Sequence, residues 1–366
     1  MSEVNSVQAG SPVPGGSAEQ GAVQDPGVVS RKIYGMADYV SGPMLRDAAA
    51  FRESGTVKSG YSNIDALTNI YPGLYVLGAI SSLGKTTFVH QMADQMAQAG
   101  QQVLFFSLEQ SILEMAGKSL SRVMARHDAS KAMTSLQIRK NMEDPRVSAA
   151  VAEYAAYAAN LTIVECTFRA DIDTIASVTS SYIQQTGKKP VVIVDYLQVI
   201  QPAEGSRLST KDLTDYHVRR LKQIQVDHAV PVIVISSLNR QNYLSLIDFE
   251  SFKESGGIEY TADVIWGLQL QCLHDPVFES QSKLNEKRET IRKAKAAVPR
   301  QVELVCLKNR FGISSYTCAF NYYPHCDLFV PAGVESGSGQ AGLDTDPDGF
   351  IRVEDAGFDC SDSPFF

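Results

Sequence analysis

The sequence predicts an α/β fold built on a twisted, mostly parallel sheet with helices on both faces. Three apolar runs carry this prediction, at residues 76–80, 103–106 and 191–194. The first leads into a loop of small residues and a helical pattern, and the other two lead to single acids, Glu109 and Asp195. Central parallel strands are buried on both faces and therefore appear as continuous apolar runs. Acids that follow such strands are delivered at their C-terminal ends.

The loop after the first run has the composition of a phosphate-binding loop. It passes from a strand through small residues to Gly-Lys-Thr and a helix, so backbone N–H groups and the helix N-terminus face a polyphosphate. Lys85 is expected to neutralise the outer phosphates, and the Thr86 hydroxyl to hold Mg²⁺. Ala79 stands where the usual pattern has its first glycine, and an ordinary strand-to-helix turn is the alternative. The expected phosphate-binding residues are Ser81, Ser82, Leu83, Gly84, Lys85, Thr86 and Thr87.

The two acids supply the remaining chemistry that a nucleotide site needs. Asp195 ends its apolar run, where a carboxylate would hold Mg²⁺ through water; a helix cap or turn residue is the alternative. Glu109, placed beside the phosphate loop, would take a proton from an attacking water. A solvated loop acid has the same sequence pattern, so spacing alone leaves both interpretations of Glu109 open.

Seven blocks, in order along the chain, resemble the C-terminal motor domain of DnaB-type replicative helicases, a branch of the RecA-like ATPases. The resemblance covers residues 56–330, and Asp195-Tyr196-Leu197-Gln198 is its most specific block. It implies a RecA-like fold with ATP and Mg²⁺ as cofactors. The other blocks are residues 60–65, 79–87, 106–109, 236–240, 253–259 and 308–310.

The resemblance assigns roles to single residues of the nucleotide site. Lys85 and Thr86 would bind the phosphates and Mg²⁺. Asp195 would organise the metal, and Glu109 would be the general base. Ser237 would sense the γ-phosphate at a position where the family usually has Gln, and its shorter side chain implies altered coupling, step size or ATPase rate.

Lys308 and Arg310 match the basic finger of the family, which reaches across a subunit interface to the neighbour's γ-phosphate. A cation aimed at the charge that develops in the transition state is worth ~10³–10⁵ in rate. A finger supplied by a neighbour needs a repeating heterologous interface, so the resemblance implies a homo-oligomeric ring, a hexamer in the family. A solvated basic pair at a strand end is the alternative.

The resemblance also implies single-stranded DNA as a ligand. Lys253, Glu254 and Gly256 match the DNA loop of the family, with Lys253 on a phosphate and the Gly256 backbone close to the strand. Arg207 and Lys211 are weaker candidates in a second polar loop, where a flexible exposed segment explains them equally well.

Four regions divide the chain. Residues 1–30 are rich in Gly, Pro, Ser and Gln without a targeting pattern, which predicts a disordered tail. Residues 31–55 carry an apolar helical stripe, broken by Ser41-Gly42-Pro43, at the place of the family's linker helix; a helix packed on its own domain is the alternative. The motor spans 56–330, and an acidic disordered tail spans 331–366. The residues before the motor are too few for the helical collar that contacts primase in the family.

Charge is unevenly distributed along the chain. From residue 331 onward, eight acids and one arginine give a net charge of −7 out of −8 for the whole chain. Seven basic residues between Lys283 and Arg300 predict an exposed basic helix inserted between two core strands. A solvated helix and a contact to incoming DNA are the two interpretations of this segment.

Composition fits a cytoplasmic enzyme without a membrane partner. No run approaches the ~18 apolar residues of a membrane span. The six cysteines show no paired metal spacing, which predicts buried thiols in a reducing compartment. Trp266 follows two apolar residues, and we expect it to serve packing and not base stacking.

Taken with the resemblance, these features imply an ATP-dependent, ring-forming DNA helicase or translocase. It would act on single-stranded DNA during replication of a chromosome, phage or mobile element, with primase or other replication proteins as partners. A DNA-stimulated RecA-like ATPase of recombination or repair, without unwinding, is one alternative. An ATP-binding, ring-forming interaction protein is another, which Ser237 keeps open.

Overall fold

The computed structural model describes most of the 366-residue chain and divides it into two compact units, residues 1–50 and 51–366. Both predicted tails, apart from a few residues at 331–332, 344–345 and 351–352, lie outside the described residues, as do Lys253 and Glu254. The described residues are 35–54, 57–166, 170–202, 205, 207–239, 243–252, 255–280, 282–332, 344–345 and 351–352.

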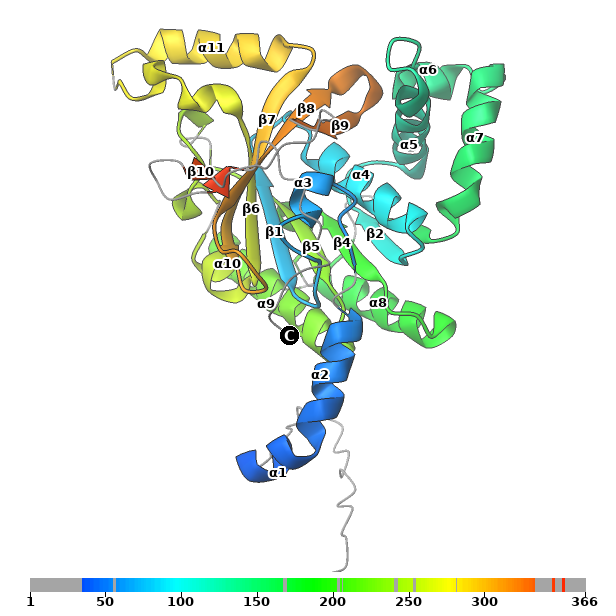
Figure 1. Cartoon of the computed structure of the whole chain (residues 1–366), viewed down its shortest axis with the longest axis vertical. Helices are drawn as coiled ribbons and strands as arrows, with labels where there is room; N and C mark the ends of the chain where they lie inside the picture. Colours follow the sequence, from blue (N-terminus) through cyan, green and yellow to red (C-terminus); the bar gives the residue numbers. More distant parts are fainter. Residues whose placement is uncertain are drawn as a thin grey trace, which may run out of the picture. The chain divides into compact units, whose positions relative to one another are not determined.

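The second unit is built on a single eleven-stranded sheet (Figure 1). Its strands are β1 (Leu74–Ala79), β2 (Val103–Ser107), β3 (Leu161–Glu165), β4 (Val191–Asp195), β5 (Val232–Ser237), β6 (Val264–Leu270), β7 (Arg300–Asn309), β8 (Tyr316–Tyr323), β9 (Leu328–Pro331), β10 (Asp344–Thr345) and β11 (Ile351–Arg352). Six strands form a parallel core in the order β6-β1-β5-β4-β2-β3. From β6 the sheet continues antiparallel through β7, β8 and β9. The predicted α/β class with a mostly parallel sheet is confirmed.

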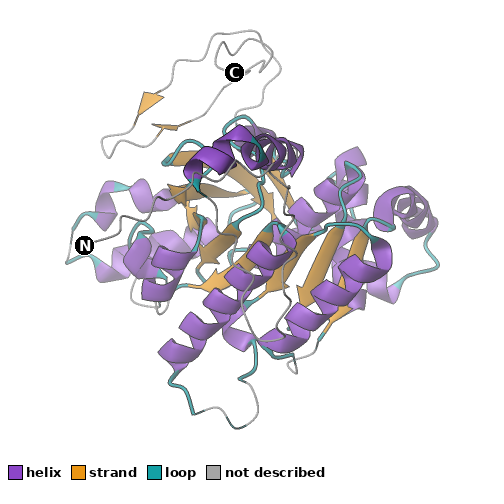
Figure 2. Cartoon of the chain, turned by 90° about the horizontal axis from the view of Figure 1, so that it is seen from below, coloured by secondary structure: helices purple, strands orange, loops and turns teal. Residues whose placement is uncertain are grey.

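Helices cover both faces of this sheet (Figure 2). Those of the second unit are α3 (Ser62–Asp65), α4 (Lys85–Gln98), α5 (Ile112–His127), α6 (Ser135–Lys140), α7 (Pro145–Ala158), α8 (Ile172–Thr186), α9 (Thr210–His228), α10 (Ser255–Thr261) and α11 (Leu284–Ala296). Local chemistry fixes several starts: the Ser111 hydroxyl and the Glu114 carboxylate form a capping box at α5. None of the described helices is long and apolar enough to span a membrane.

The apolar runs of the sequence become the buried centre of the sheet. Every residue of β1, β2 and β4 is buried, as the parallel-strand prediction requires. Trp266 on β6 is 1% exposed, and its indole N–H donates to the Tyr316 hydroxyl over 3.0 Å, so the packing role is confirmed. Gly78 near the end of β1 has no room for a side chain, because a Cβ there would lie 2.4 Å from the Phe252 ring.

The predicted basic helix between two core strands is confirmed as α11, which lies between β6 and β7 in the chain. Two basic residues of this segment are paired with nearby acids: Lys283, just before the helix, lies 3.2 Å from Glu286, and Arg292 lies 2.7 Å from Glu289. Exposed pairs of this kind stabilise a helix only weakly. These two contacts agree with the solvated-helix interpretation, and a contact of the segment with DNA stays a prediction.

In the first unit, α1 (Met36–Ser41) ends just before Gly42, and α2 (Pro43–Ser54) begins just after it. The predicted break in the helical stripe is confirmed. Elsewhere, Cys306, Cys318 and Cys326 are buried, Cys166 and Cys272 are half-buried, and these five described cysteines are all free.

Candidate nucleotide-binding site

The phosphate loop joins the buried end of β1 to the first turn of α4. Gly84 adopts a left-handed backbone with φ of 98°, which most residues avoid, and a Cβ added there would lie 3.0 Å from the Phe329 and Tyr322 rings. Ser82 also has a positive φ, of 65°. The loop therefore bends tightly and presents the N-terminus of a buried helix to the space beyond the sheet.

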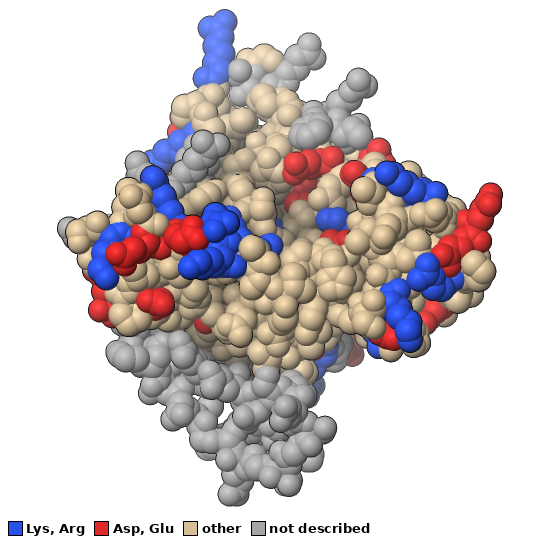
Figure 3. All heavy atoms as spheres, turned by 90° about the horizontal axis from the view of Figure 1, so that it is seen from above, with Lys and Arg blue, Asp and Glu red and all other residues tan. Residues whose placement is uncertain are grey.

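A cavity of about 410 Å³ lies over this loop. It brings together nine of the predicted site residues with three that were not predicted. The cavity edge of the sheet, seen in Figure 3, is hollowed at its centre, where acidic and basic side chains meet. Leu83 is buried in the core and does not line the cavity. The lining residues are Ser81, Ser82, Gly84, Lys85, Thr86, Thr87, Glu109, Gln110, Lys118, Asp195, Tyr196 and Ser237.

The Lys85 ammonium is folded back onto its own loop. Its Nζ donates to the carbonyl of Ala79 over 3.1 Å. Burial lowers the pKa of Lys85, and the Asp195 and Glu109 carboxylates oppose this shift. Among the described residues this half-desolvated cation has one neutral acceptor, so its charge is poorly compensated and would attract an anion into the cavity.

Asp195 ends β4 with a carboxylate that is 2% exposed. Burial raises its pKa to about 6, while the Thr86 hydroxyl and the Lys118 and Lys85 ammoniums act in the opposite direction. Its Oδ2 is buried without a hydrogen-bond partner. An orphaned carboxylate oxygen next to a threonine hydroxyl is an oxygen donor set suited to Mg²⁺. The residues present therefore fit the metal that the sequence predicts.

Glu109 lies at the same edge of the sheet because β2 and β4 are neighbours. Ser107 is in register with Asp195, and the Leu108 N–H donates to the Asp195 carbonyl over 3.0 Å. The turn that carries Glu109 is held by the Ser107 hydroxyl, which donates to the Gln110 carbonyl over 2.6 Å. Glu109 is exposed at the cavity and so remains accessible to water.

Ser237 also reaches the cavity, from the end of β5. It is in register with Ala79 at the end of β1, and its N–H donates to Gln198 Oε1 over 3.0 Å. The Gln198 amide also donates to the Ser236 hydroxyl over 2.9 Å. The predicted sensor position is thus tied to the Asp-Tyr-Leu-Gln block.

Lys118 is a cavity residue that the sequence interpretation missed. It projects from α5, with Nζ 3.4 Å from the Thr87 hydroxyl and 3.9 Å from the Asp327 carboxylate. Burial lowers its pKa. The available signal was a lysine on the helix face that also carries the buried Met115 and Arg122, at spacings of three and four residues.

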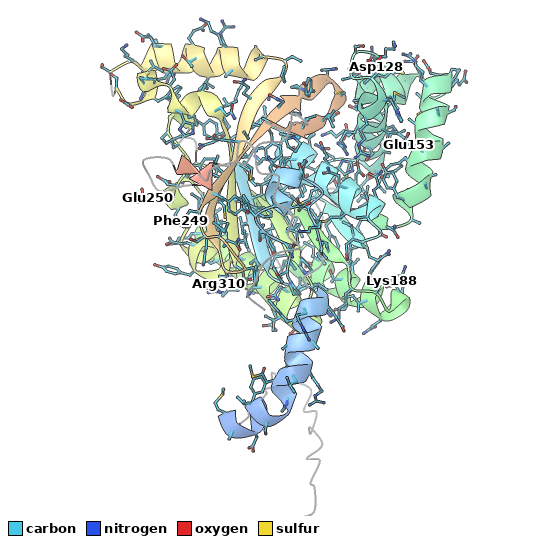
Figure 4. The ribbon with its side chains drawn as sticks, in the orientation of Figure 1. Asp128, Glu153, Lys188, Phe249, Glu250 and Arg310 are labelled. Carbon is cyan, nitrogen blue, oxygen red and sulfur yellow. The ribbon has the colours of Figure 1, made fainter. Side chains whose placement is uncertain are left out.

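Lys308 and Arg310 lie at the opposite edge of the sheet. β7 runs antiparallel to β6, so the end of β7 lies beside Val264, where β6 begins. Lys308 donates to the Glu259 carbonyl over 2.6 Å, and Arg310, labelled in Figure 4, lies 3.1 Å from the Asp263 carboxylate. Neither lines the cavity, and a strand of six residues separates the two edges by roughly 20 Å.

The predicted DNA-contacting residues are placed only in part. Lys253 and Glu254 lie outside the described residues. Gly256, near the start of α10, has open space around it, whereas a Cβ at Gly257 would collide with Asp215 of α9. Lys211 is exposed one turn before Asp215 on α9. The beginnings of α9 and α10 therefore lie side by side, and the described residues there do not line the cavity.

Comparison with solved structures agrees with this architecture. One similar structure is an ATPase domain, with a TM-score of 0.64 and 23% identity, over 81% of this chain and 99% of that one. Another is a DnaB-like replicative helicase studied for its interactions with primase, with a TM-score of 0.62 and 22% identity, over 82% of this chain and 67% of that one. The fold defines a RecA-like α/β domain, as predicted.

The family is defined by the sequence. The DnaB-like helicase C-terminal domain family matches residues 56–330, so the chain belongs to this family. It is 30% identical over 226 residues to the replicative DNA helicase DnaB of Leifsonia xyli subsp. xyli, and 28% identical over 215 residues to that of Haemophilus influenzae. Each match covers 57% of this chain and 45% of the relative, so the chain spans about half the length of these relatives.

Proposed function

We propose that this protein is an ATP-dependent, ring-forming DNA helicase or translocase that acts on single-stranded DNA in replication. The observation that carries the proposal is the convergence of Lys85, Thr86, Glu109 and Asp195 on one cavity, in a chain of the DnaB-like family. These are the cation, hydroxyl, base and metal carboxylate that phosphoryl transfer to water requires.

Each residue has a step that its position allows. The phosphate loop and Lys85 bind the β- and γ-phosphates of ATP, and the ammonium exchanges the Ala79 carbonyl for a phosphate oxygen. Thr86 and the ionised Asp195 would hold Mg²⁺, which neutralises charge on the phosphates. Glu109 orients a water in line with the γ-phosphate and accepts its proton. Ser237 lies where a γ-phosphate contact would be relayed through Gln198.

Lys308 and Arg310 complete the site of a neighbouring subunit. Support comes from their place at the edge of the sheet opposite their own cavity. A finger that serves the next chain requires a closed repeating interface, and we propose a hexameric ring. Residues 31–55 would form the linker that docks on the adjacent subunit, ahead of a motor at 56–330 and between tails at 1–30 and 331–366.

DNA would pass the beginnings of α9 and α10. Gly256 offers an open backbone, and Lys253, Glu254, Arg207 and Lys211 would add side-chain contacts, the basic ones to phosphates. A cytoplasmic location and a primase or other replication protein as partner complete the proposal.

ATP hydrolysis with and without single-stranded DNA tests this proposal, with Lys85→Ala as the blank and Lys188→Ala, an exposed lysine, as the matched control. We expect turnover that DNA stimulates and that only the first variant abolishes, followed by strand displacement on forked DNA. Turnover that is indifferent to DNA would move the assignment to a non-helicase ATPase. Binding of ATP without turnover in either condition would favour the ring-forming interaction protein.

A further inference from the structure

Two cations of the basic segment at residues 283–300 donate hydrogen bonds to backbone carbonyls of the phosphate loop. Lys295, near the end of α11, donates from Nζ to the Ser81 carbonyl over 3.1 Å. Arg300, the first residue of β7, donates from Nη1 to the Ser82 carbonyl over 2.9 Å. Neither cation lines the cavity itself. Their hydrogen bonds therefore go to the backbone of the loop.

The two cations are themselves held in place. Arg300 donates from Nε to the Lys295 carbonyl over 3.0 Å, and its guanidinium lies 5.4 Å from the centre of the Tyr322 ring. Tyr322 in turn lies against the glycine of the loop, Gly84. Both cations are partly buried, and burial lowers the pKa of each, with Arg300 adding to the effect on Lys295. Two like charges in such a place cost stability, so a role beyond packing explains them better.

Because a peptide unit is planar, a cation that fixes the direction of a loop carbonyl also fixes the direction of the next N–H. In a trans peptide the C=O and the following N–H point in opposite directions, and the described cis bonds lie elsewhere, at residues 195–196 and 298–299. A cation that fixes the Ser81 carbonyl outward thus directs the Ser82 N–H toward the cavity side. Arg300 does the same for the Leu83 N–H. A charged partner on the carbonyl also polarises the N–H and strengthens it as a donor.

The contact falls on the loop residue with the least favourable backbone. Ser82 has a φ of 65°, a left-handed conformation that costs free energy for a residue with a side chain. Its carbonyl is the acceptor of Arg300. The guanidinium therefore stabilises a loop conformation that the loop would otherwise adopt less often, before any ligand is present.

We propose that Lys295 and Arg300 are positioning residues that preset the phosphate loop, so that its N–H groups face a nucleoside di- or triphosphate without reorganisation. The inference deepens the proposed nucleotide site and rests on it. It gives α11 and the start of β7 a role in nucleotide affinity that is separate from any contact with DNA.

The proposal predicts a loss of ground-state binding and not of chemistry. Because a hydrogen bond from a charged donor is stronger than one from a neutral donor, removing the Arg300 cation should weaken ADP binding about tenfold. The KM for ATP should rise by a similar factor while kcat is retained, since the same contact serves ground state and transition state.

The test is titration of wild type and four variants with a fluorescent ADP in Mg²⁺ buffer. Arg300→Met and Lys295→Met keep the aliphatic stems but remove the charges; Arg300→Lys restores one donor; Lys293→Ala removes an exposed cation of the same helix as the matched control. We expect about tenfold weaker binding for both methionine variants, recovery to within about threefold for Arg300→Lys, and no change for Lys293→Ala.

Thermal melting without nucleotide shows which variants are folded. If Arg300→Met does not fold, Lys295→Met and Arg300→Lys decide the question. Folded methionine variants that bind ADP like wild type would overturn the inference, and so would a fall in kcat at unchanged KM. Wild-type protein that binds no ADP would overturn the nucleotide site itself, a different failure.

Discussion

The two ends of the parallel strands carry different groups of charged residues. At the edge where the strands end, Lys85, Glu109 and Asp195 surround a cavity within one chain. At the edge where they begin, Lys308 and Arg310 contact acceptors of their own chain and do not line that cavity. If the proposed roles hold, one chain therefore contains most of a phosphoryl-transfer site together with a pair of cations that do not reach this site.

The charged side chains at these two places also differ in how far they are buried. At the cavity, Asp195 is buried and Lys85 is half-buried, and burial shifts the pKa of both. Arg310 is 53% exposed beside Asp263, a buried carboxylate that also accepts from the Leu74 N–H, at the start of β1. Asp263 therefore links Arg310 to the start of β1, the strand that ends at the phosphate loop.

The largest expected effect is the loss of the finger. Arg310→Ala should lower kcat for ATP by ~10³–10⁵ and leave ADP affinity nearly unchanged, because the cation acts on transition-state charge in another subunit. Steady-state hydrolysis and ADP titration measure the two quantities. Arg146→Ala is the matched control, since Arg146 is also an exposed arginine in an ion pair, 2.7 Å from Asp144. An equal loss of ADP affinity in Arg310→Ala would contradict the separation of the edges.

The second largest effect should come from removing one partner of the buried ion pair between Arg122 and Asp94. Arg122 is 1% exposed, 2.6 Å from Asp94, and donates to the Asp327 carbonyl over 3.2 Å. Arg122→Ala leaves a buried carboxylate uncompensated and should cost about 3–5 kcal/mol of unfolding free energy in urea titrations. The double variant Arg122→Met with Asp94→Leu should recover most of that loss. No recovery would mean that the network contributes more than its charge balance.

Whereas Arg122→Ala should lower the free energy of unfolding, the raised pKa of Asp195 predicts that removing this carboxylate should increase it. Burial raises this pKa from 3.8 to about 6, so between these values the folded state keeps a proton that the unfolded state has lost. Stability from this group therefore falls as pH rises through that window. Asp195→Asn should be inactive. Its free energy of unfolding should equal that of wild type below about pH 4 and exceed it by about 3 kcal/mol above about pH 6. Unfolding curves at several pH values that show a constant difference would contradict this account.

The smallest effect concerns the position where the family usually has glutamine. Ser237→Gln puts a longer donor at the cavity, beside Gln198. One hydrogen bond is worth about 0.5–1.5 kcal/mol, so DNA-stimulated turnover should change by roughly two- to tenfold. ADP affinity should stay constant. A change in ADP affinity alone would show that Ser237 contacts the loop and does not report on the γ-phosphate.

The sequence predicted the cavity edge well because its chemistry is local. The loop at 81–87 and the acids after β2 and β4 follow directly from strand ends, and parallel strands bring those ends together. Lys118 was missed because a single lysine on a helix has the pattern of a solvated residue.

Lys295 and Arg300 were interpreted as surface charge for a different reason. Arg300 contacts Ser82 across 218 positions of sequence, and nothing in local periodicity indicates which loop the start of β7 will meet. The antiparallel pairing of β7 with β6 was likewise not predicted. This pairing places Lys308 and Arg310 near the beginning of β6, at the end of the strands away from the cavity.

Mixing two inactive variants tests the central claim most directly. Lys85→Ala lacks a working cavity but has its finger, and Arg310→Ala has the reverse. If each finger serves the next subunit, random rings from equal amounts contain about one intact interface in four, so ATP hydrolysis should reappear on mixing. Light scattering would verify that the mixed chains assemble. Assembled rings that stay inactive at every mixing ratio would contradict the account, because they would show that cavity and finger must belong to the same chain.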